Sequence, residues 1–261
     1  MSTISTANRQ MFKRLLWIAM GFLVAALILS AVERKSTRNA NEVLIQIREL
    51  PDGNTLVNRE DILLTLERSF GHRLVGVPLG AIDMNRVERV LEEEPFVLNA
   101  DAFIDAAGKI HIELTQREPI LRVIDKNGLN YYLDPSGRKM PLSPHFTARV
   151  LVATGNIPPF VPDFQKRKRH VLKDLFALTN TILDDDFMRV MVEQVYRSET
   201  GSYTLIPKLG YQKIVLGPYE AIDEKLERLR VFYREGIPYE GWQKYSTINL
   251  TFDGQVVCKR R

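Results

Sequence analysis

The chain has 261 residues, of which 45% are hydrophobic and 26% charged, and its formal net charge is +4. This apolar fraction is sufficient for a buried core, and so small a charge, spread along the chain, argues against a dedicated nucleic-acid-binding protein. The single cysteine, Cys258, excludes an intrachain disulfide and a cysteine-based zinc site, so packing alone must stabilise the fold.

Residues 15–32 form an apolar run without a charged side chain, and Trp17 lies near one end of it. At about 1.5 Å per residue, a helix of this run spans roughly 27 Å, close to the hydrocarbon thickness of a bilayer. A buried core helix and a cleaved signal peptide are the alternatives, but the run lacks both a polar face and a good cleavage site. We therefore expect an uncleaved, single-pass transmembrane helix between a short tail at 1–14 and a linker at 33–42. Basic residues flank both ends of the run, so charge alone does not decide which side of the membrane holds residues 33–261.

The segment after the linker predicts a small α+β module at 43–117. Its expected elements are a strand at 43–50, a helix capped by Asn58 and ended by Gly71, a helix capped by Asp83 and ended by Pro95, and strands at 96–106 and 108–116 joined at Ala107-Gly108. The order strand, helix, helix, strand, strand allows two helices to cover one face of a three-stranded sheet.

Residues 118–261 predict a mostly antiparallel β domain with flanking helices. The expected strands are at 120–124, 131–133, on both sides of Gly137, and at 149–153, 188–196, 203–207 and 213–216, with helices at 164–183 and 219–235. The chain ends in "STINLTFDGQVVCKRR", where Ile248, Leu250 and Phe252 alternate with polar residues and the pattern resumes after Asp253-Gly254. We expect a terminal strand here, with no later strand to cover its outer side.

Several clusters invite a chemical interpretation, but ordinary structural roles explain each of them better. They are the acidic runs at 92–94 and 184–186, the pair His111 and Glu113, the basic run at 166–169, and Cys258. We expect, respectively, a solvated helix end, a helix cap or turn, an exposed polar strand face, a solvated helix start and an inert thiol. The sequence contains no P-loop, HExxH, GxSxG or GxGxxG motif. We therefore expect no catalytic residues, no metal, no cofactor and no small-molecule substrate.

The segment "VERVLEEEPFVLNADAFIDAAGKIHIELTQREPILRV" is similar in layout to the bacterial cell-division family FtsQ/DivIB. The matching features are a helix that ends at Pro95-Phe96-Val97, Ala100 in the next strand, the Gly108 turn, and Arg117-x-Pro119 leading into a new module. The segment at 201–233 and the closing "STINLTFDGQVV" also resemble that family. The sequence departs from the family pattern at Asn249, where Asp is usual, and at Thr251, where a basic residue is frequent.

The resemblance implies a transmembrane anchor, a POTRA domain at 43–117 and an FtsQ-type β domain at 118–261. It further implies a cytoplasmic tail at 1–14, periplasmic domains, and a place in the cell inner membrane, enriched at the division septum. The implied function is a non-catalytic divisome scaffold that links membrane division proteins, among them FtsB-like and FtsL-like single-pass proteins, and helps control septal peptidoglycan synthesis.

Two other classes of protein remain as alternatives. A POTRA-containing envelope transport or outer-membrane assembly factor would need a barrel, for which residues 120–261 are too few and too helical. An anchored cell-wall enzyme would need a nucleophile–base pair or a metal cluster, and the sequence suggests neither.

The terminal strand is the candidate binding site. An exposed strand edge offers unpaired N–H and C=O groups to which a partner strand can add. The resemblance implies such a role, because the FtsQ family binds FtsB through its last strand. Alternatively, the free side of the strand is merely solvated or covered by a loop. Carried over by position, the candidate partner-binding residues are Leu250, Thr251, Phe252, Gly254, Gln255, Val256 and Val257.

Overall fold

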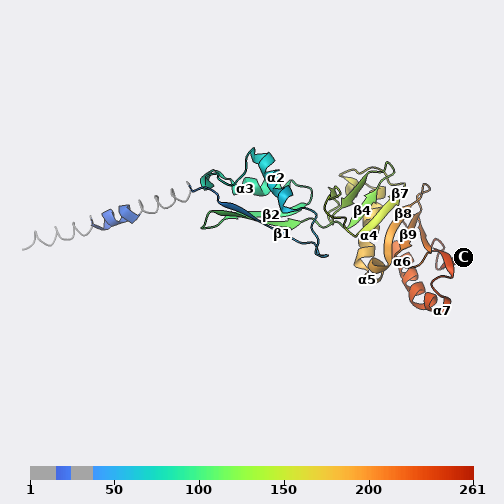
Figure 1. Ribbon diagram of the computed structural model, residues 1–261. Helices are drawn as coiled ribbons and strands as arrows, with labels where there is room; N and C mark the ends of the chain where they lie inside the picture. Colours follow the sequence, from blue (N-terminus) through green and yellow to red (C-terminus); the bar gives the residue numbers. More distant parts are fainter. Residues whose placement is uncertain (1–15, 25–37) are drawn as a thin grey trace, which may run out of the picture. The chain divides into compact units, whose positions relative to one another are not determined.

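The computed structural model describes residues 16–24 and 38–261, and the chain divides into two compact units, Met1–Gln116 and Arg117–Arg261 (Figure 1). Residues 16–24 are helical. The other residues of the expected transmembrane helix at 15–32, the tail at 1–14 and the first part of the linker lie outside the described residues. Within the described ranges, no helix combines the length and the apolar character that crossing a membrane requires.

The first unit contains a three-stranded sheet with two α-helices. Its elements are β1 (Glu42–Arg48), α2 (Arg59–Phe70), the 3-10 turn η1 (Leu79–Ala81), α3 (Met84–Glu92), β2 (Val97–Ile104) and β3 (Lys109–Gln116). The sheet order is β1-β3-β2, with β1 parallel and β2 antiparallel to β3. This arrangement confirms the expected order of strand, helix, helix, strand and strand.

Local side-chain capping explains where these helices begin and end. Asn58 accepts a hydrogen bond from the Asp61 N–H (2.9 Å), and the Asp61 carboxylate accepts one from the Asn58 N–H (3.0 Å), which forms a capping box at the start of α2. Gly71 ends α2 in the left-handed conformation, with φ of 76°. At the start of α3, the Asp83 side chain accepts a hydrogen bond from the Arg86 N–H and so caps the helix.

The second unit is built on a nine-stranded mixed sheet in the order β12-β11-β10-β9-β8-β7-β4-β5-β6. Its strands are β4 (Leu121–Ile124), β5 (Asn130–Leu133), β6 (Lys139–Met140), β7 (Leu151–Gly155), β8 (Val192–Arg197), β9 (Tyr203–Pro207), β10 (Lys213–Gly217), β11 (Tyr245–Asn249) and β12 (Val257–Arg260). The helical elements are η2 (Phe164–Lys166), α4 (Val171–Asp184), α5 (Asp186–Met191), α6 (Ile222–Val231), η3 (Phe232–Gly236) and α7 (Ile237–Glu240). Three pairs are parallel, β4 with β7, β7 with β8, and β10 with β11, so the sheet is less uniformly antiparallel than we expected.

The helices α4 and α6 pack on one face of this sheet (Figure 1). Leu175 of α4 and Leu229 of α6 share a buried cluster with Leu205 of β9, Ile214 of β10 and Ile248 of β11. Along β7 and β9, buried residues alternate with half-buried ones, which is the period of a sheet with one buried face. The core of the second unit therefore lies between the sheet and its helices.

Three expected elements of the second unit differ from the structure. The helix predicted at 164–183 begins only at Val171, because the His170 side chain accepts a hydrogen bond from the Leu172 N–H (3.2 Å) and so starts α4 there, after the separate 3-10 turn η2. The strand predicted at 188–196 begins as helix α5, because the Asp185 carboxylate accepts hydrogen bonds from the N–H groups of Phe187 (2.9 Å) and Met188 (3.0 Å) and starts a helix. The helix predicted at 219–235 is interrupted by the π-helical turn η3 shortly before Pro238, whose ring disturbs the regular helical hydrogen bonds.

Candidate partner-binding site

The carboxyl-terminal segment forms a hairpin, so the prediction of one terminal strand was wrong. Strands β11 and β12 pair antiparallel, and residues 250–256 connect them. Asn249 explains why β11 stops, because its side-chain oxygen accepts hydrogen bonds from the Thr251 N–H (2.9 Å) and hydroxyl (2.8 Å) and so bends the chain. Gly254, with φ of 66°, supplies the left-handed residue that the returning turn needs.

Strand β12 lies at one end of the sheet order and pairs with β11 on one side. On its other side, no strand of the described ranges is hydrogen-bonded to it. The register places Val257 opposite Asn249 and Cys258 opposite Ile248. An outer flank of this kind presents main-chain donors and acceptors to which an added strand can bind.

The structure divides the seven predicted residues into three groups. Val257 lies in β12 itself and is 42% exposed, whereas Leu250 is fully buried and its N–H donates to the Val215 carbonyl (2.9 Å). The rest belong to the connecting loop: Thr251, Phe252, Gly254 and Gln255 are exposed, and Val256 is half-buried. Of the seven predicted residues, therefore, Val257 lies on the strand edge, Leu250 is buried, and the other five belong to the loop that precedes β12.

A groove of about 490 Å³ lies beside this loop. The residues that line it come from α6, η3 and the loop: Glu227, Arg228, Val231, Phe232, Glu235, Gly236, Gly254 and Val256. The Arg228 guanidinium donates a hydrogen bond to the Leu250 carbonyl (3.1 Å) and so ties the loop to α6. An apolar groove next to a free strand edge offers a partner both main-chain pairing and a pocket for a side chain.

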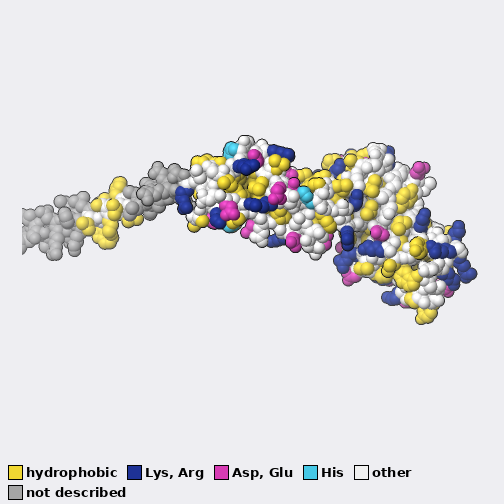
Figure 2. Space-filling model, viewed as in Figure 1, with side chains coloured by type: hydrophobic (Ala, Val, Ile, Leu, Met, Phe, Trp, Pro, Cys, Tyr) yellow, Lys and Arg dark blue, Asp and Glu magenta, His cyan; other side chains and the backbone are white. Residues whose placement is uncertain are grey.

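Three exposed cations lie at the carboxyl-terminal end of this region. Lys259, Arg260 and Arg261 end the chain and are exposed, and Figure 2 shows Lys and Arg side chains gathered at the carboxyl-terminal end of the second unit. Burial lowers the pKa of Lys225 on α6 and raises the pKa of the Cys258 thiol. A cationic strand edge deters self-association and attracts an acidic partner strand.

Comparisons with known proteins agree with this architecture. A family model described as "FtsQ/DivIB, C-terminal related" matches residues 118–259. The chain belongs to the FtsQ/DivIB family. A second model, described as "POTRA-like domain", matches residues 38–115. Cell division protein FtsQ of Salinibacter ruber (strain DSM 13855 / M31) is 26% identical over 196 residues, which cover 71% of this chain and 73% of that protein. The predicted family is therefore confirmed, and with it membership in a group of membrane-associated division proteins.

The groove beside the FtsQ strand edge was not anticipated from the sequence. Arg228, Val231 and Phe232 are spaced so that they share one face of the helix that the sequence predicts at 219–235. That spacing was a usable signal, but only the packing of the loop at 250–256 against the helix turns this face into a groove.

The other clusters singled out in the sequence occupy structural positions. The Nε2–H of His111 donates a hydrogen bond to the Asp105 carboxylate (3.0 Å), and the ring stacks on Phe103, with ring centroids 4.9 Å apart. Asp185 caps α5, which confirms the expected helix cap. The basic run at 166–169 is exposed but lies before α4, so the helix start expected there was wrong. Across residues 16–24 and 38–261, no group of three or more His, Cys, Asp or Glu residues is placed to hold a metal ion.

Proposed function

We propose that this FtsQ-family protein is a non-catalytic scaffold of the divisome that binds a strand of a membrane-anchored division partner at the free edge of β12. The FtsB-like and FtsL-like single-pass proteins are the proposed partners, and control of septal peptidoglycan synthesis is the proposed outcome of the assembly. The observation that carries the proposal is the position of β12 at the end of the nine-stranded sheet, beside the groove lined by Phe232 and Val256.

Strand addition suits this edge for two reasons. Main-chain hydrogen bonds to β12 supply affinity that is independent of the partner sequence, and the groove selects an apolar side chain. The exposed cations Lys259 and Arg260 flank the added strand and select acidic side chains. We therefore expect a partner strand with Asp or Glu next to an apolar residue, and binding that weakens as the salt concentration rises.

The proposed location is the inner membrane at the division septum, with both folded units in the periplasm and residues 15–32 as the anchor. An anchor confines the scaffold and its partners to the same surface. This confinement raises their effective concentration, so a modest intrinsic affinity is sufficient for assembly.

Binding of overlapping synthetic peptides that cover the FtsB-like protein outside its membrane segment tests the proposal. We expect Val256→Asp to weaken binding at least about tenfold, because it places a charge in the apolar groove. Because Val256 also packs against the core, the pair Lys259→Glu with Arg260→Glu serves as a second variant that changes only exposed side chains.

The matched control is Lys168→Glu with Arg169→Glu, which reverses two exposed cations in the same unit away from β12. Circular dichroism verifies that each variant is folded. Native affinity in both folded test variants would refute the edge as the binding site. In cells, depletion of the protein should give filaments, whereas normal division with altered envelope permeability would support a transport or assembly role instead.

A further inference from the structure

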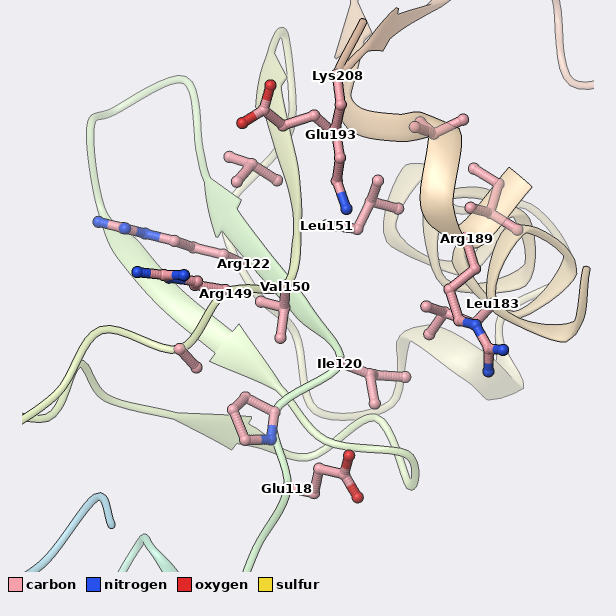
Figure 3. Close-up of a pocket in the computed structure, with 15 residues that line it drawn as sticks. Glu118, Ile120, Arg122, Arg149, Val150, Leu151, Leu183, Arg189, Glu193 and Lys208 are labelled. Carbon is pink, nitrogen blue, oxygen red and sulfur yellow. The ribbon is translucent and has the colours of Figure 1, made fainter. Parts of the chain in front are cut away.

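A second cleft, of about 750 Å³, lies in the FtsQ-type unit at the opposite part of the sheet from β12 (Figure 3). The strands β4, β7 and β8 are neighbours and run parallel, so their amino ends lie at one end of the sheet. The cleft opens at these amino ends, where Ile120, Leu151 and Val192 line it. Strands β9, β10 and β11 separate β8 from β12, so the cleft and the proposed strand-addition edge are different sites.

The floor of the cleft is apolar. Leu151 and Val192 are buried at the starts of β7 and β8, and Ile120 and Val150 lie beside them, just before β4 and β7. Leu183, near the end of α4, adds an aliphatic side chain from the helical layer. In Figure 3, Ile120, Val150, Leu151 and Leu183 all lie around the centre of the cleft.

Three cations line the same cleft without a carboxylate partner. In the described part of the chain, neither Arg122, Arg149 nor Lys208 lies within 4.0 Å of an acidic oxygen; Arg122 donates instead to the neutral Asn130 side chain (3.0 Å). Figure 3 shows the guanidinium groups of Arg122 and Arg149 extending to the same side of the cleft, with Lys208 reaching in from the neighbouring segment. Like charges that line one cleft without a counter-ion repel one another, and a bound anionic ligand reduces that repulsion.

The composition of the lining distinguishes between classes of anion. Glu118 and Glu193 also line the cleft and form no ion pair with these three cations, so a ligand with dense negative charge, such as a phosphate-rich surface, meets repulsion there. The cations surround an apolar floor and are spread over β4, the segment before β7 and the residue after β9, instead of converging on one point. This pattern matches an extended peptide in which acidic side chains alternate with aliphatic ones.

We propose that this cleft binds an extended acidic segment of a protein partner. The carboxylates of that segment contact Arg122, Arg149 and Lys208, and an aliphatic side chain packs on Ile120, Val150 and Leu151. Arginine suits this role, because its planar guanidinium binds a carboxylate through two parallel hydrogen bonds. The proposal adds a second docking site to the chain and does not depend on strand addition at β12.

Fluorescence anisotropy of the purified full chain with a labelled peptide of alternating Glu and Leu tests the proposal. We expect saturable binding, which Arg122→Glu combined with Arg149→Glu weakens by about tenfold or more, the effect of losing one charge-assisted hydrogen bond. Arg122→Gln combined with Arg149→Gln provides a gentler variant with the same expected direction. A peptide of alternating Lys and Leu should not bind.

Two control variants separate this site from others. The pair Lys168→Glu with Arg169→Glu should leave the binding of the acidic probe unchanged. The probe also suits the strand edge proposed at β12, so the pair Lys259→Glu with Arg260→Glu serves to remove binding at that edge. In this second background saturable binding should remain and should still be weakened by Arg122→Glu combined with Arg149→Glu, whatever the outcome at β12. Loss of all probe binding in the second pair would place the probe at β12 and overturn the proposal.

Two further measurements would show whether the cleft instead binds another class of ligand. Competition by pyrophosphate at the probe's own concentration would indicate a small-anion site, and binding of vesicles containing phosphatidylglycerol that Arg149→Glu abolishes would indicate a lipid site. Either result overturns the proposal. So does the absence of saturable probe binding up to about 1 mM, the range of the weakest specific complexes.

Discussion

The ion pair between Arg117 and Asp134 offers the clearest quantitative test of the fold of the second unit. Arg117 donates from Nε (2.9 Å) and Nη2 (2.7 Å) to Oδ2 of Asp134, and the two side chains are only 7% and 4% exposed. The other carboxylate oxygen, Oδ1, accepts from the Ser136 N–H (2.9 Å) and hydroxyl (2.6 Å) and from the Arg138 N–H (2.9 Å). Asp134 thus holds the turn between β5 and β6 to the first residue of the unit.

Replacement of Asp134 by Asn removes the negative charge. It also places an NH₂ group, which is itself a donor, opposite N–H and O–H groups that all require an acceptor. Removal of one partner from a buried ion pair costs about 3–5 kcal/mol, because the buried charge that remains loses its counter-ion. Asn retains one oxygen, so we expect a loss of about 3 kcal/mol. With a urea dependence of about 2 kcal/mol per molar, the unfolding midpoint should fall by about 1.5 M.

Tryptophan fluorescence during urea unfolding measures this change selectively. The chain has two tryptophans, Trp17 and Trp242, and residues 38–116 contain neither, so the signal from Trp242 follows the second unit. The control is Asp163→Asn, whose partner Arg167 lies 3.2 Å away and is 46% exposed in its side chain. An exposed pair contributes between about 0 and 1 kcal/mol, so the control should move the midpoint by less than about 0.5 M. Equal shifts in the two variants would refute the reasoning from burial.

The same carboxyl predicts a pH dependence of stability. Burial alone would raise the pKa of Asp134, but the hydrogen bonds from Ser136 and Arg117 outweigh burial and hold the pKa below its usual value of 3.8. The unfolded chain therefore binds the proton more readily than the folded chain does. This stabilisation is fully present above the unfolded pKa and is lost as pH falls through the lower, folded pKa. The gap in stability between the wild type and Asp134→Asn should accordingly be constant near neutral pH and narrow below about pH 4.

Two further predictions concern a close backbone contact and the single thiol. Gly155→Ala should destabilise the second unit by about 2–4 kcal/mol in urea unfolding, because φ is +99° and the added Cβ would lie 2.1 Å from the Arg197 carbonyl oxygen. Gly128→Ala, with φ of +81° and open space around the added carbon, should cost only about 1 kcal/mol, so equal losses in the two variants would contradict the steric argument. Cys258 should react with a disulfide reagent at pH 8 several times more slowly than glutathione does, because burial raises the pKa of its thiol. Unfolding in urea should increase the rate. A rate as fast as that of glutathione in the folded protein would show that the thiol is not shielded.

Helix boundaries in the first unit could be predicted from the sequence because their causes are local. The Asn58 cap, its reciprocal partner Asp61 and the Gly71 stop all lie within one or two turns of the residues that they organise. The prediction of a strand failed at 188–191. The residues there have the apolar character of a strand, but Asp185 caps a helix that includes them.

The binding sites depended on contacts between residues that are distant in the chain. The period-two pattern of the terminal segment correctly indicated strand, but it could not show that Asn249 bends the chain and that β12, not residues 250–256, forms the edge. The groove needs α6 to pack beside the 250–256 loop, and the cationic cleft needs β4, β7 and β8 to run parallel.

By itself, the sequence determined the order of most elements and the helix caps, since these follow from hydrogen bonds and periodicities within a few residues. The layout of its motifs along the chain indicated the family by resemblance. Only the tertiary structure decided which strand ends the sheet and which cations line one cleft without a carboxylate partner. Both depend on pairings such as that of Lys213 with Thr247, which join strands far apart in the chain. The packing free energy of the whole core selects such pairings, and a short stretch of sequence does not contain the residues that contribute to it.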